Sequence, residues 1–284
     1  MKKSRFYILF VTFFVFLLLL FPIFFDNACK AVNSEKNNID FFGKKFITGF
    51  HLKFFKRRFI IYKEPNSPPP EKGFPVLFLF HGAVQHAFSW FFGFNFWSKA
   101  QTSFTRYALE NGFFVVSFES LKPIRPGPRA WDAFEKNMTD NSDFLYLKNV
   151  ISWLDNSSLS VDVGSIYCAG FSSGAFFCSR LSQSFDYKFK GVIINSGCNA
   201  NCITLTNFGP VFNCSTGFNI SSKHPPALIV HGKKDSLVPY MCAESYYQDL
   251  LDGGFEASLL ADNSSGHIWL KKYNDLIIDW LKNH

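Results

Sequence analysis

The sequence contains no cysteine and histidine spacing typical of a metal site and no internal repeat. Its formal net charge is +7, but beyond the short run Lys56-Arg57-Arg58 it has no basic stripe of the kind that nucleic-acid-binding proteins use. We therefore expect no nucleic-acid partner, no metal ion and no cofactor. Outside residues 6–25 no uncharged apolar stretch is long enough to span a bilayer, so we expect at most one membrane anchor.

The N-terminus has the pattern of a secretory signal. Basic side chains within the first five residues precede an unbroken apolar run over residues 6–25. The run is also long enough to remain in the membrane as an uncleaved anchor. We expect residues 1–31 to be a signal peptide or signal anchor and residues 32–284 to form one domain. The chain is then secreted, or held at the membrane by its N-terminal segment.

Cysteines and glycosylation sequences agree with that compartment. Of the seven cysteines, Cys29 lies beside the expected processing boundary. Cys168 falls in an expected buried strand and Cys178 in an expected helix, so we expect packed thiols there rather than a bridge. Four others lie in expected loops and are candidates for two disulfides, with the pairing open: Cys198, Cys202, Cys214 and Cys242. Candidate glycosylation sites are Asn137, Asn156, Asn213, Asn219 and Asn263.

The pattern of the chain changes after the turn-forming segment 65–70. Before it, two β-rich runs at residues 46–52 and 57–62 predict an antiparallel edge hairpin. After it, short apolar segments alternate with amphipathic ones, which predicts a mostly parallel sheet with helices on both faces. Strands are expected at residues 76–80, 113–118, 165–169, 191–195, 227–230 and 257–261. Helices are expected at residues 96–110, 142–154, 173–184, 242–251 and 269–281.

A Gly-x-Ser-x-Gly sequence joins an expected strand to an expected helix at Gly170-Phe171-Ser172-Ser173-Gly174. This context is typical of a nucleophile elbow, in which the two glycines permit strand and helix to approach closely. Ser172 is therefore the candidate nucleophile. Ser173 is the first residue of the expected helix, and its backbone N–H is expected to donate to a developing oxyanion.

The candidate acid and base follow in the order nucleophile, acid, histidine. Asp235 comes after the expected strand 227–230, where an acid can orient an imidazole. His267 lies in a loop of small residues between the last expected strand and the last expected helix. His284 is a poorer candidate because it is the terminal residue, and Asp262 is too close to His267 in sequence to be its usual partner.

The turn after the first parallel strand, His81-Gly82-Ala83, is expected to supply the second oxyanion donor. The donor is the backbone N–H of Gly82 or of Ala83, and we assign it to Ala83. His81 and His231 each precede a glycine at a strand end, so we expect structural hydrogen bonds from them rather than catalysis. The aromatic cluster at residues 90–94 either lines an acyl pocket or packs in the core.

The sequence resembles the α/β-hydrolase group of polyhydroxybutyrate depolymerases, feruloyl esterases and acetylxylan esterases (carbohydrate esterase family 1). The resemblance covers roughly residues 74–267. Its motifs are His81-Gly82-Ala83-Val84-Gln85-His86-Ala87, Asp143-Phe144-Leu145, Val161-Asp162 leading into 165–180, Asn195-Ser196-Gly197-Cys198, and 226–232 with Asp235 and Val238-Pro239-Tyr240. Two departures are Ser173, where relatives more often carry a small residue or glycine, and Trp131-Asp132, which matches the relatives' tryptophan-containing loop only loosely.

The resemblance implies a single α/β-hydrolase domain with Ser172, Asp235 and His267 as its triad, in agreement with the residues themselves. We expect a carboxylic-ester hydrolase that forms an acyl-enzyme on feruloyl or acetyl polysaccharide esters, polyesters or short acyl esters. One alternative is a serine peptidase of the same fold. The other is a secreted binding protein without activity, although such a protein has no chemical reason to keep all three residues.

Overall fold

The computed structural model describes residues 38–41, 44–56, 58–121, 129–137, 139–187, 189–206 and 209–284. The expected signal segment 1–31, with Cys29, lies outside these residues. Among the helices that are described, none is both long and apolar enough to cross a membrane.

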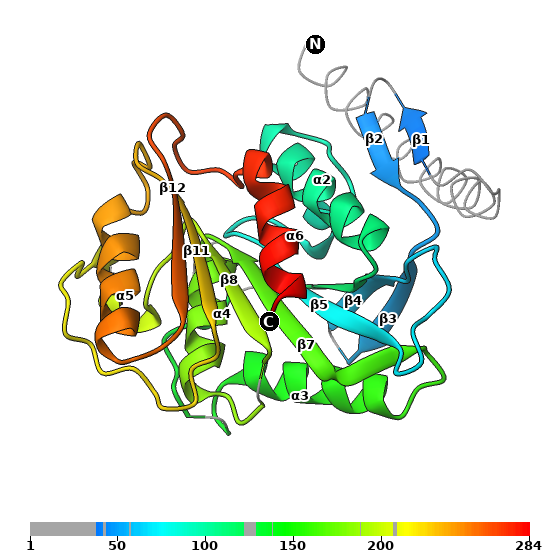
Figure 1. Cartoon of the computed structure of the whole chain (residues 1–284), viewed down its shortest axis with the longest axis horizontal. Coiled ribbons are helices and arrows are strands. Elements are labelled where there is room, and N and C mark those ends of the chain that lie inside the picture. Colours follow the sequence, from blue (N-terminus) through cyan, green and yellow to red (C-terminus); the bar gives the residue numbers. More distant parts are fainter. Residues whose placement is uncertain are drawn as a thin grey trace, which may run out of the picture.

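An eight-stranded sheet forms the centre of the molecule, in the order β12-β11-β8-β7-β5-β6-β4-β3 (Figure 1). The strands are β3 (His51–Phe55), β4 (Arg58–Lys63), β5 (Phe74–Phe80), β6 (Phe114–Phe118), β7 (Val161–Phe171), β8 (Gly191–Asn195), β11 (Ala227–Gly232) and β12 (Ala257–Asp262). Neighbours from β5 to β12 pair in parallel, whereas β3 and β4 pair antiparallel at one edge. The mostly parallel sheet and the antiparallel edge hairpin are thus confirmed.

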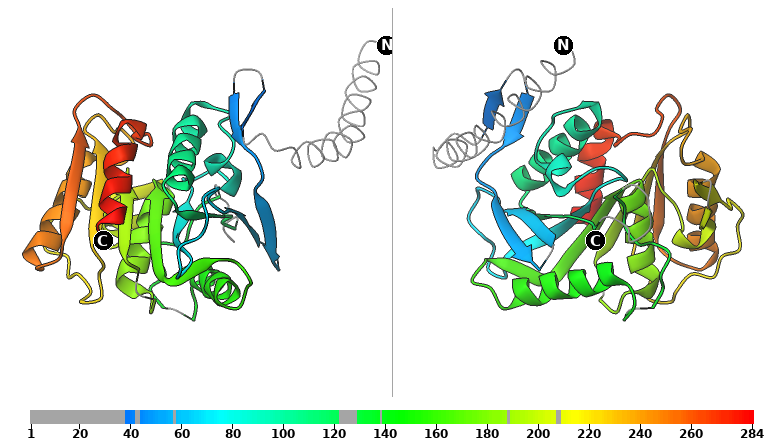
Figure 2. Two further views of the ribbon diagram at one scale, coloured as in Figure 1. Left: turned by 45° about the vertical axis from the view of Figure 1, so that its right-hand side comes forward. Right: turned by 180° about the vertical axis from the view of Figure 1, so that it is seen from behind.

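Helices cover both faces of this sheet, as predicted (Figure 2). They are α2 (Phe96–Glu110), α3 (Ser142–Asp155), α4 (Ser173–Ser184), α5 (Tyr240–Asp252) and α6 (Asn274–Lys282). Side chains alternate along β5, so Phe78 belongs to the core that includes residues of α3, α4 and α5 on one face, and Leu79 to the core that includes residues of α2 and α6 on the other. Because both faces are covered, the central strands consist mainly of apolar residues.

The two largest differences from the predicted boundaries are at the starts of the hairpin and of the last helix. The hairpin's first strand starts at His51, because Phe46 and Ile47 belong to a separate ribbon of β1 (Asn38–Phe41) and β2 (Lys44–Ile47). The last helix starts at Asn274 rather than at residue 269. The apolar side chain of Trp269 that suggested a helix is instead buried from an irregular segment, against Trp90.

The segment between β8 and β11 contains another short ribbon, β9 (Ile203–Thr206) with β10 (Gly209–Phe212). Short 3-10 turns occur at Ala87–Trp90, Ala200–Cys202 and Lys271–Tyr273. The segment between β8 and β11 lies on the side of the molecule that carries α4 and α5, since Phe212 stacks on Phe176 and Cys214 is bonded to Cys242.

The disulfide arrangement corrects the sequence analysis. Cys168 on β7 is bonded to Cys178 on α4, so the expectation of two unpaired thiols is wrong. The chain reverses at the turn between these elements, and α4 packs back along β7 with the two Cα atoms 6.2 Å apart. Cys214–Cys242 is one disulfide within the predicted set of four. Cys198 and Cys202 are free, buried thiols in the structure, which therefore contains one of the two disulfides expected in that set.

Candidate active site

Ser172 occupies the sharp turn between β7 and α4. Its φ of +54° lies in the left-handed region that non-glycine residues rarely adopt. A Cβ atom on Gly170 would lie 2.1 Å from the carbonyl oxygen of Gly174, and one on Gly174 would lie 2.2 Å from that of Phe80. Both glycines are therefore required by backbone packing, and the turn they permit carries the serine at its apex.

The structure brings Ser172, His267 and Asp235 together at the carboxyl ends of the parallel strands. Ser172 Oγ lies 2.9 Å from Nε2 of His267, and Nδ1 of His267 lies 2.7 Å from Oδ2 of Asp235. Asp235 follows β11 and His267 follows β12. With Nδ1–H donating to the carboxylate, Nε2 is the atom that can accept the serine proton.

Asp235 is held in place by four hydrogen-bonding groups. Its Oδ1 accepts from the N–H groups of Leu237 and Val238, each at 2.9 Å. Its Oδ2 faces His267 and, at 3.3 Å, Nε2 of His231. Burial alone would raise the pKa of Asp235, but the hydrogen bonds from His231, His267 and Val238 outweigh it and hold that pKa well below its usual range. The side chain is therefore a buried carboxylate.

The two expected oxyanion donors lie in turns at the ends of neighbouring strands. Ala83 follows β5, and Ser173 is the first residue of α4. Within the described residues, neither backbone N–H donates a hydrogen bond to another protein group. Both are thus available to a ligand, and the helix N-terminus adds a favourable field for negative charge at Ser173.

His81 and His231 form the hydrogen bonds of structural residues. Nδ1 of His81 lies 2.8 Å from the carbonyl oxygen of Gly82, and its Nε2 accepts from the Ser120 N–H at 3.3 Å. Burial lowers the pKa of His81 to about 3, so this imidazole is neutral. The contact of His231 with the acid itself was not predicted, although its place four residues before Asp235 was an available signal.

The aromatic cluster at residues 90–94 divides between core and surface. Trp90 and Phe91 are fully buried, whereas Phe94 is exposed. A different aromatic residue, Trp97 on α2, lies beside the triad with its ring 6.4 Å from that of His267, and 42% of it is exposed. The position of Trp97 beside His267 was not predicted, because nothing in the local sequence indicates that α2 starts beside the loop after β12.

The potential metal ligands are residues other than Ser172, His267 and Asp235. In the described part of the chain, the group that could hold an ion is Cys198, Cys202 and Cys242, whose sulfur atoms lie within 4.8 Å of one another. Cys242 is bonded to Cys214, so two free thiols remain there. The chemistry that the serine, histidine and carboxylate can perform is nucleophilic acyl transfer.

Two curated proteins resemble the sequence. No family model matches it. A poly(3-hydroxyoctanoate) depolymerase of Pseudomonas fluorescens is 26% identical over 235 residues, which is 80% of each chain. A feruloyl esterase B of Thermothelomyces thermophilus is 26% identical over 195 residues, 60% of this chain and 62% of the esterase. The resemblance to the depolymerase and feruloyl esterase group is thereby confirmed.

Solved structures of esterases share the fold. An acetyl xylan esterase from Aspergillus awamori superposes with a TM-score of 0.60 and 12% identity, over 83% of this chain and 99% of the esterase. The Staphylococcus aureus fluorophosphonate-binding serine hydrolase F superposes with a TM-score of 0.58 and 16% identity, over 85% and 99% of the two chains. The fold is therefore that of the α/β-hydrolases, and the relationship to a depolymerase and a feruloyl esterase supports a carboxylic-ester hydrolase.

Proposed function

We propose that the protein hydrolyses carboxylic esters with Ser172 as nucleophile, His267 as general base and Asp235 as the residue that orients His267. The observation that carries this proposal is the continuous chain of hydrogen-bond distances from Ser172 Oγ through the imidazole to the buried Asp235 carboxylate. A surface histidine or a solvated aspartate would not need this order of contacts.

The reaction proceeds in two halves. Ser172 Oγ attacks the ester carbonyl carbon while its proton passes to Nε2 of His267. The imidazolium then returns that proton to the departing alkoxide, which leaves an acyl group on Ser172. Water, deprotonated by His267, releases the acid and restores the serine. In each half, the N–H groups of Ala83 and Ser173 stabilise the tetrahedral oxyanion, and Asp235 stabilises the imidazolium.

We propose that the substrate is a feruloyl or acetyl polysaccharide ester, a polyester or a short acyl ester. The exposed indole of Trp97 beside His267 offers an apolar surface for an acyl or aromatic group. The two curated relatives support the same range, since one is a depolymerase of a polyester and the other a feruloyl esterase.

We further propose that the protein acts in the secretory pathway or outside the cell. Its two disulfides are stable in an oxidising compartment. The asparagine of each candidate glycosylation sequence is exposed, as attachment of a glycan requires: Asn137, Asn156, Asn213, Asn219 and Asn263. The basic and apolar N-terminal segment supplies the expected targeting signal.

The test compares wild type, Ser172→Ala and the exposed control Ser67→Ala on p-nitrophenyl acetate, p-nitrophenyl octanoate and methyl ferulate. We expect turnover by wild type and Ser67→Ala, and loss of at least about 10⁴-fold in kcat for Ser172→Ala. A folded wild type that cleaves none of these esters contradicts the proposal. Cleavage of peptide anilides instead would favour the peptidase alternative.

A further inference from the structure

A short segment that begins at Arg129 touches both turns that carry the oxyanion donors. The carbonyl oxygen of Arg129 accepts the Val84 N–H at 2.8 Å. Trp131 Nε1 donates to the carbonyl oxygen of His81 at 2.9 Å, and the Trp131 backbone N–H donates to Ser173 Oγ at 3.0 Å. One segment thus binds the turn after β5 on both sides of Ala83 and also binds the first residue of α4.

The Trp131 ring lies between the two elements that lead to these donors. It is 3% exposed and packs edge-on against Phe80, the last residue of β5, at 5.0 Å. It stacks on Phe177 of α4 at 5.1 Å with the planes 17° apart. The indole therefore sets the spacing between the end of β5 and the start of α4 by packing as well as by hydrogen bonds.

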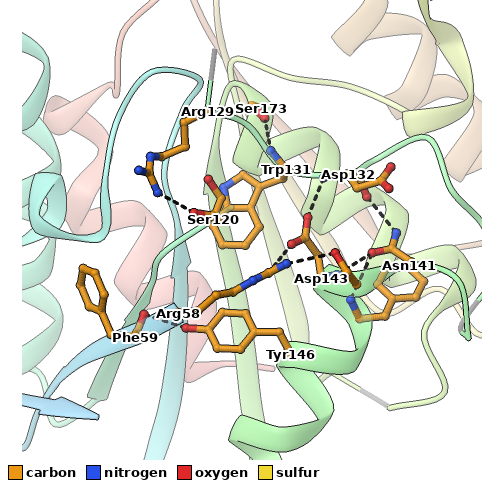
Figure 3. Close-up of polar contacts among 12 residues, drawn as sticks. Arg58, Phe59, Ser120, Arg129, Trp131, Asp132, Asn141, Asp143, Tyr146 and Ser173 are labelled. Atoms are coloured by element: carbon orange, nitrogen blue, oxygen red, sulfur yellow. Dashed lines mark hydrogen bonds and ion pairs between the residues drawn. The ribbon is translucent and has the colours of Figure 1, made fainter. Parts of the chain in front are cut away.

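Ion pairs and hydrogen bonds with buried charged side chains fix the segment to neighbouring elements (Figure 3). Arg129 pairs with Glu119 and donates to the Ser120 carbonyl oxygen at 2.7 Å. The Asp132 N–H donates at 2.7 Å to Asp143, whose carboxylate is paired with Arg58.

The far end of the segment is held in the same way. Arg180 Nε on α4 donates to the Ala133 carbonyl oxygen at 2.7 Å. A shift of the segment would separate Arg129 from Glu119 and remove hydrogen bonds from the buried side chains of Asp143 and Arg180, which is costly. The segment is therefore a rigid support for the residues that it contacts.

The turn that the segment holds is itself under strain. Val84 has a φ of +60°, a conformation that β-branched residues rarely adopt. The His81 ring holds the carbonyl oxygen of Gly82 at 2.8 Å. Because the peptide bond is trans, fixing that oxygen also fixes the direction of the Ala83 N–H on the opposite side of the same peptide. A strained turn keeps this orientation only while its surroundings enforce it.

We propose that Trp131 is a positioning residue for the oxyanion hole: it holds the donors of Ala83 and Ser173 at the spacing that the tetrahedral intermediate requires. The inference rests on the proposed ester hydrolysis and adds a role that neither the triad nor the oxyanion donors themselves supply. Loss of a whole oxyanion donor costs about 10²–10³ in kcat, so loosening of the donors costs a part of that factor.

The test is Trp131→Phe with Trp90→Phe as the matched control. Trp90 is also buried among aromatic rings, and its Nε1 has no hydrogen-bond partner within the described residues. Both changes remove the same atoms, but only the first removes a hydrogen bond, the one from Trp131 Nε1 to the His81 carbonyl oxygen in the turn that carries Ala83. We expect Trp131→Phe to lower kcat about tenfold with KM nearly unchanged, and Trp90→Phe to alter neither by more than about twofold.

The second readout is the affinity of an octyl trifluoromethyl ketone, which forms a tetrahedral adduct with Ser172. We expect Trp131→Phe to weaken it by about the same factor as kcat. If that variant does not fold, Glu119→Gln, which weakens the hold on Arg129, should give a smaller loss of the same kind. An active wild type whose folded Trp131 or Glu119 variant keeps both kcat and ketone affinity overturns this inference alone. An inactive wild type overturns the proposed function as well.

Discussion

The Nε2 atom of His231 lies 3.3 Å from Oδ2 of Asp235, so the carboxylate faces a second imidazole besides that of His267. The same Nε2 lies 3.0 Å from the carbonyl oxygen of Val238, and the His231 side chain is fully buried. The Nε2–H group of His231 therefore contacts both the acid and the backbone of the loop after β11. This contact fixes the carboxylate in the orientation that His267 requires.

Replacement of His231 tests this role. Leucine removes the donor to Asp235, and we expect kcat to fall about tenfold, because the acid is left less well oriented. Glutamine can place an amide N–H near the position of Nε2, so His231→Gln should recover most of the activity. Measurement of kcat and KM for both variants decides the matter, and equal activity of His231→Leu and wild type contradicts it.

Gly170 and Gly164 lie on the same strand but differ in their surroundings. A Cβ on Gly170 would meet backbone at 2.1 Å, whereas one on Gly164 would meet only the Asp162 carboxylate at 3.1 Å, and that side chain can move. We expect Gly170→Ala to lower the free energy of unfolding by about 3 kcal/mol or more and Gly164→Ala by less than about 1 kcal/mol. Urea unfolding monitored by tryptophan fluorescence measures both values. Equal stability of the two variants would be inconsistent with the close approach at the elbow.

Two buried histidines predict loss of stability in acid. Burial lowers the pKa of His81 to about 3 and that of His224 to about 4. In the unfolded chain both protonate near a pKa of about 6.5. The unfolded state therefore binds more protons as the pH falls below 6.5, so the stability present above that pH is lost progressively. We expect the Tm to fall steadily between pH 6.5 and 4.

The variant His224→Gln isolates one of the two groups. Between pH 6.5 and 4, the free energy of unfolding of this variant should fall by about 3 kcal/mol less than that of wild type. Its Tm should therefore depend less steeply on pH than that of wild type. Parallel curves for the two proteins would rule out a contribution from His224.

Cys198 and Cys202 lie with their sulfur atoms 2.9 Å apart, and both are buried. We expect them to form a third disulfide when the chain folds in an oxidising compartment. The two thiols then lose two protons and two electrons to a small disulfide, which is reduced to two thiols. Denaturation in N-ethylmaleimide without reductant, followed by peptide mass mapping, measures this. The prediction fails if both cysteines are alkylated, and in the control Cys198→Ser the label should reach Cys202.

Local signals predicted the elements that carry the nucleophile. The bounds of α2 and α4 agree with the sequence analysis, since a side chain of Asn95 caps α2 and the turn at Ser172 starts α4. Such signals lie within a few residues of the boundary that they define. The order of serine, acid and histidine along the chain also selected three residues that lie within hydrogen-bond distance of one another in succession from Ser172 to His267 to Asp235.

Contacts between distant segments could not be predicted in this way. Trp131 binds Ser173 and His81, which lie 42 and 50 residues away. Their proximity depends on how three loops meet at the end of the sheet. The Cys168–Cys178 bond depends on which side of α4 faces β7, and helical periodicity alone does not identify that side. The missed features are therefore those of tertiary packing.

The most direct test of the account is covalent labelling of the purified protein with a fluorophosphonate probe, followed by intact mass and peptide mapping. An activated serine is required for the reaction, so we expect one adduct, on Ser172, and labelling at least about 100-fold slower in His267→Ala. Folded wild-type protein that remains unlabelled, or that carries the adduct on another serine, would contradict the assignment of Ser172, His267 and Asp235 as the catalytic triad.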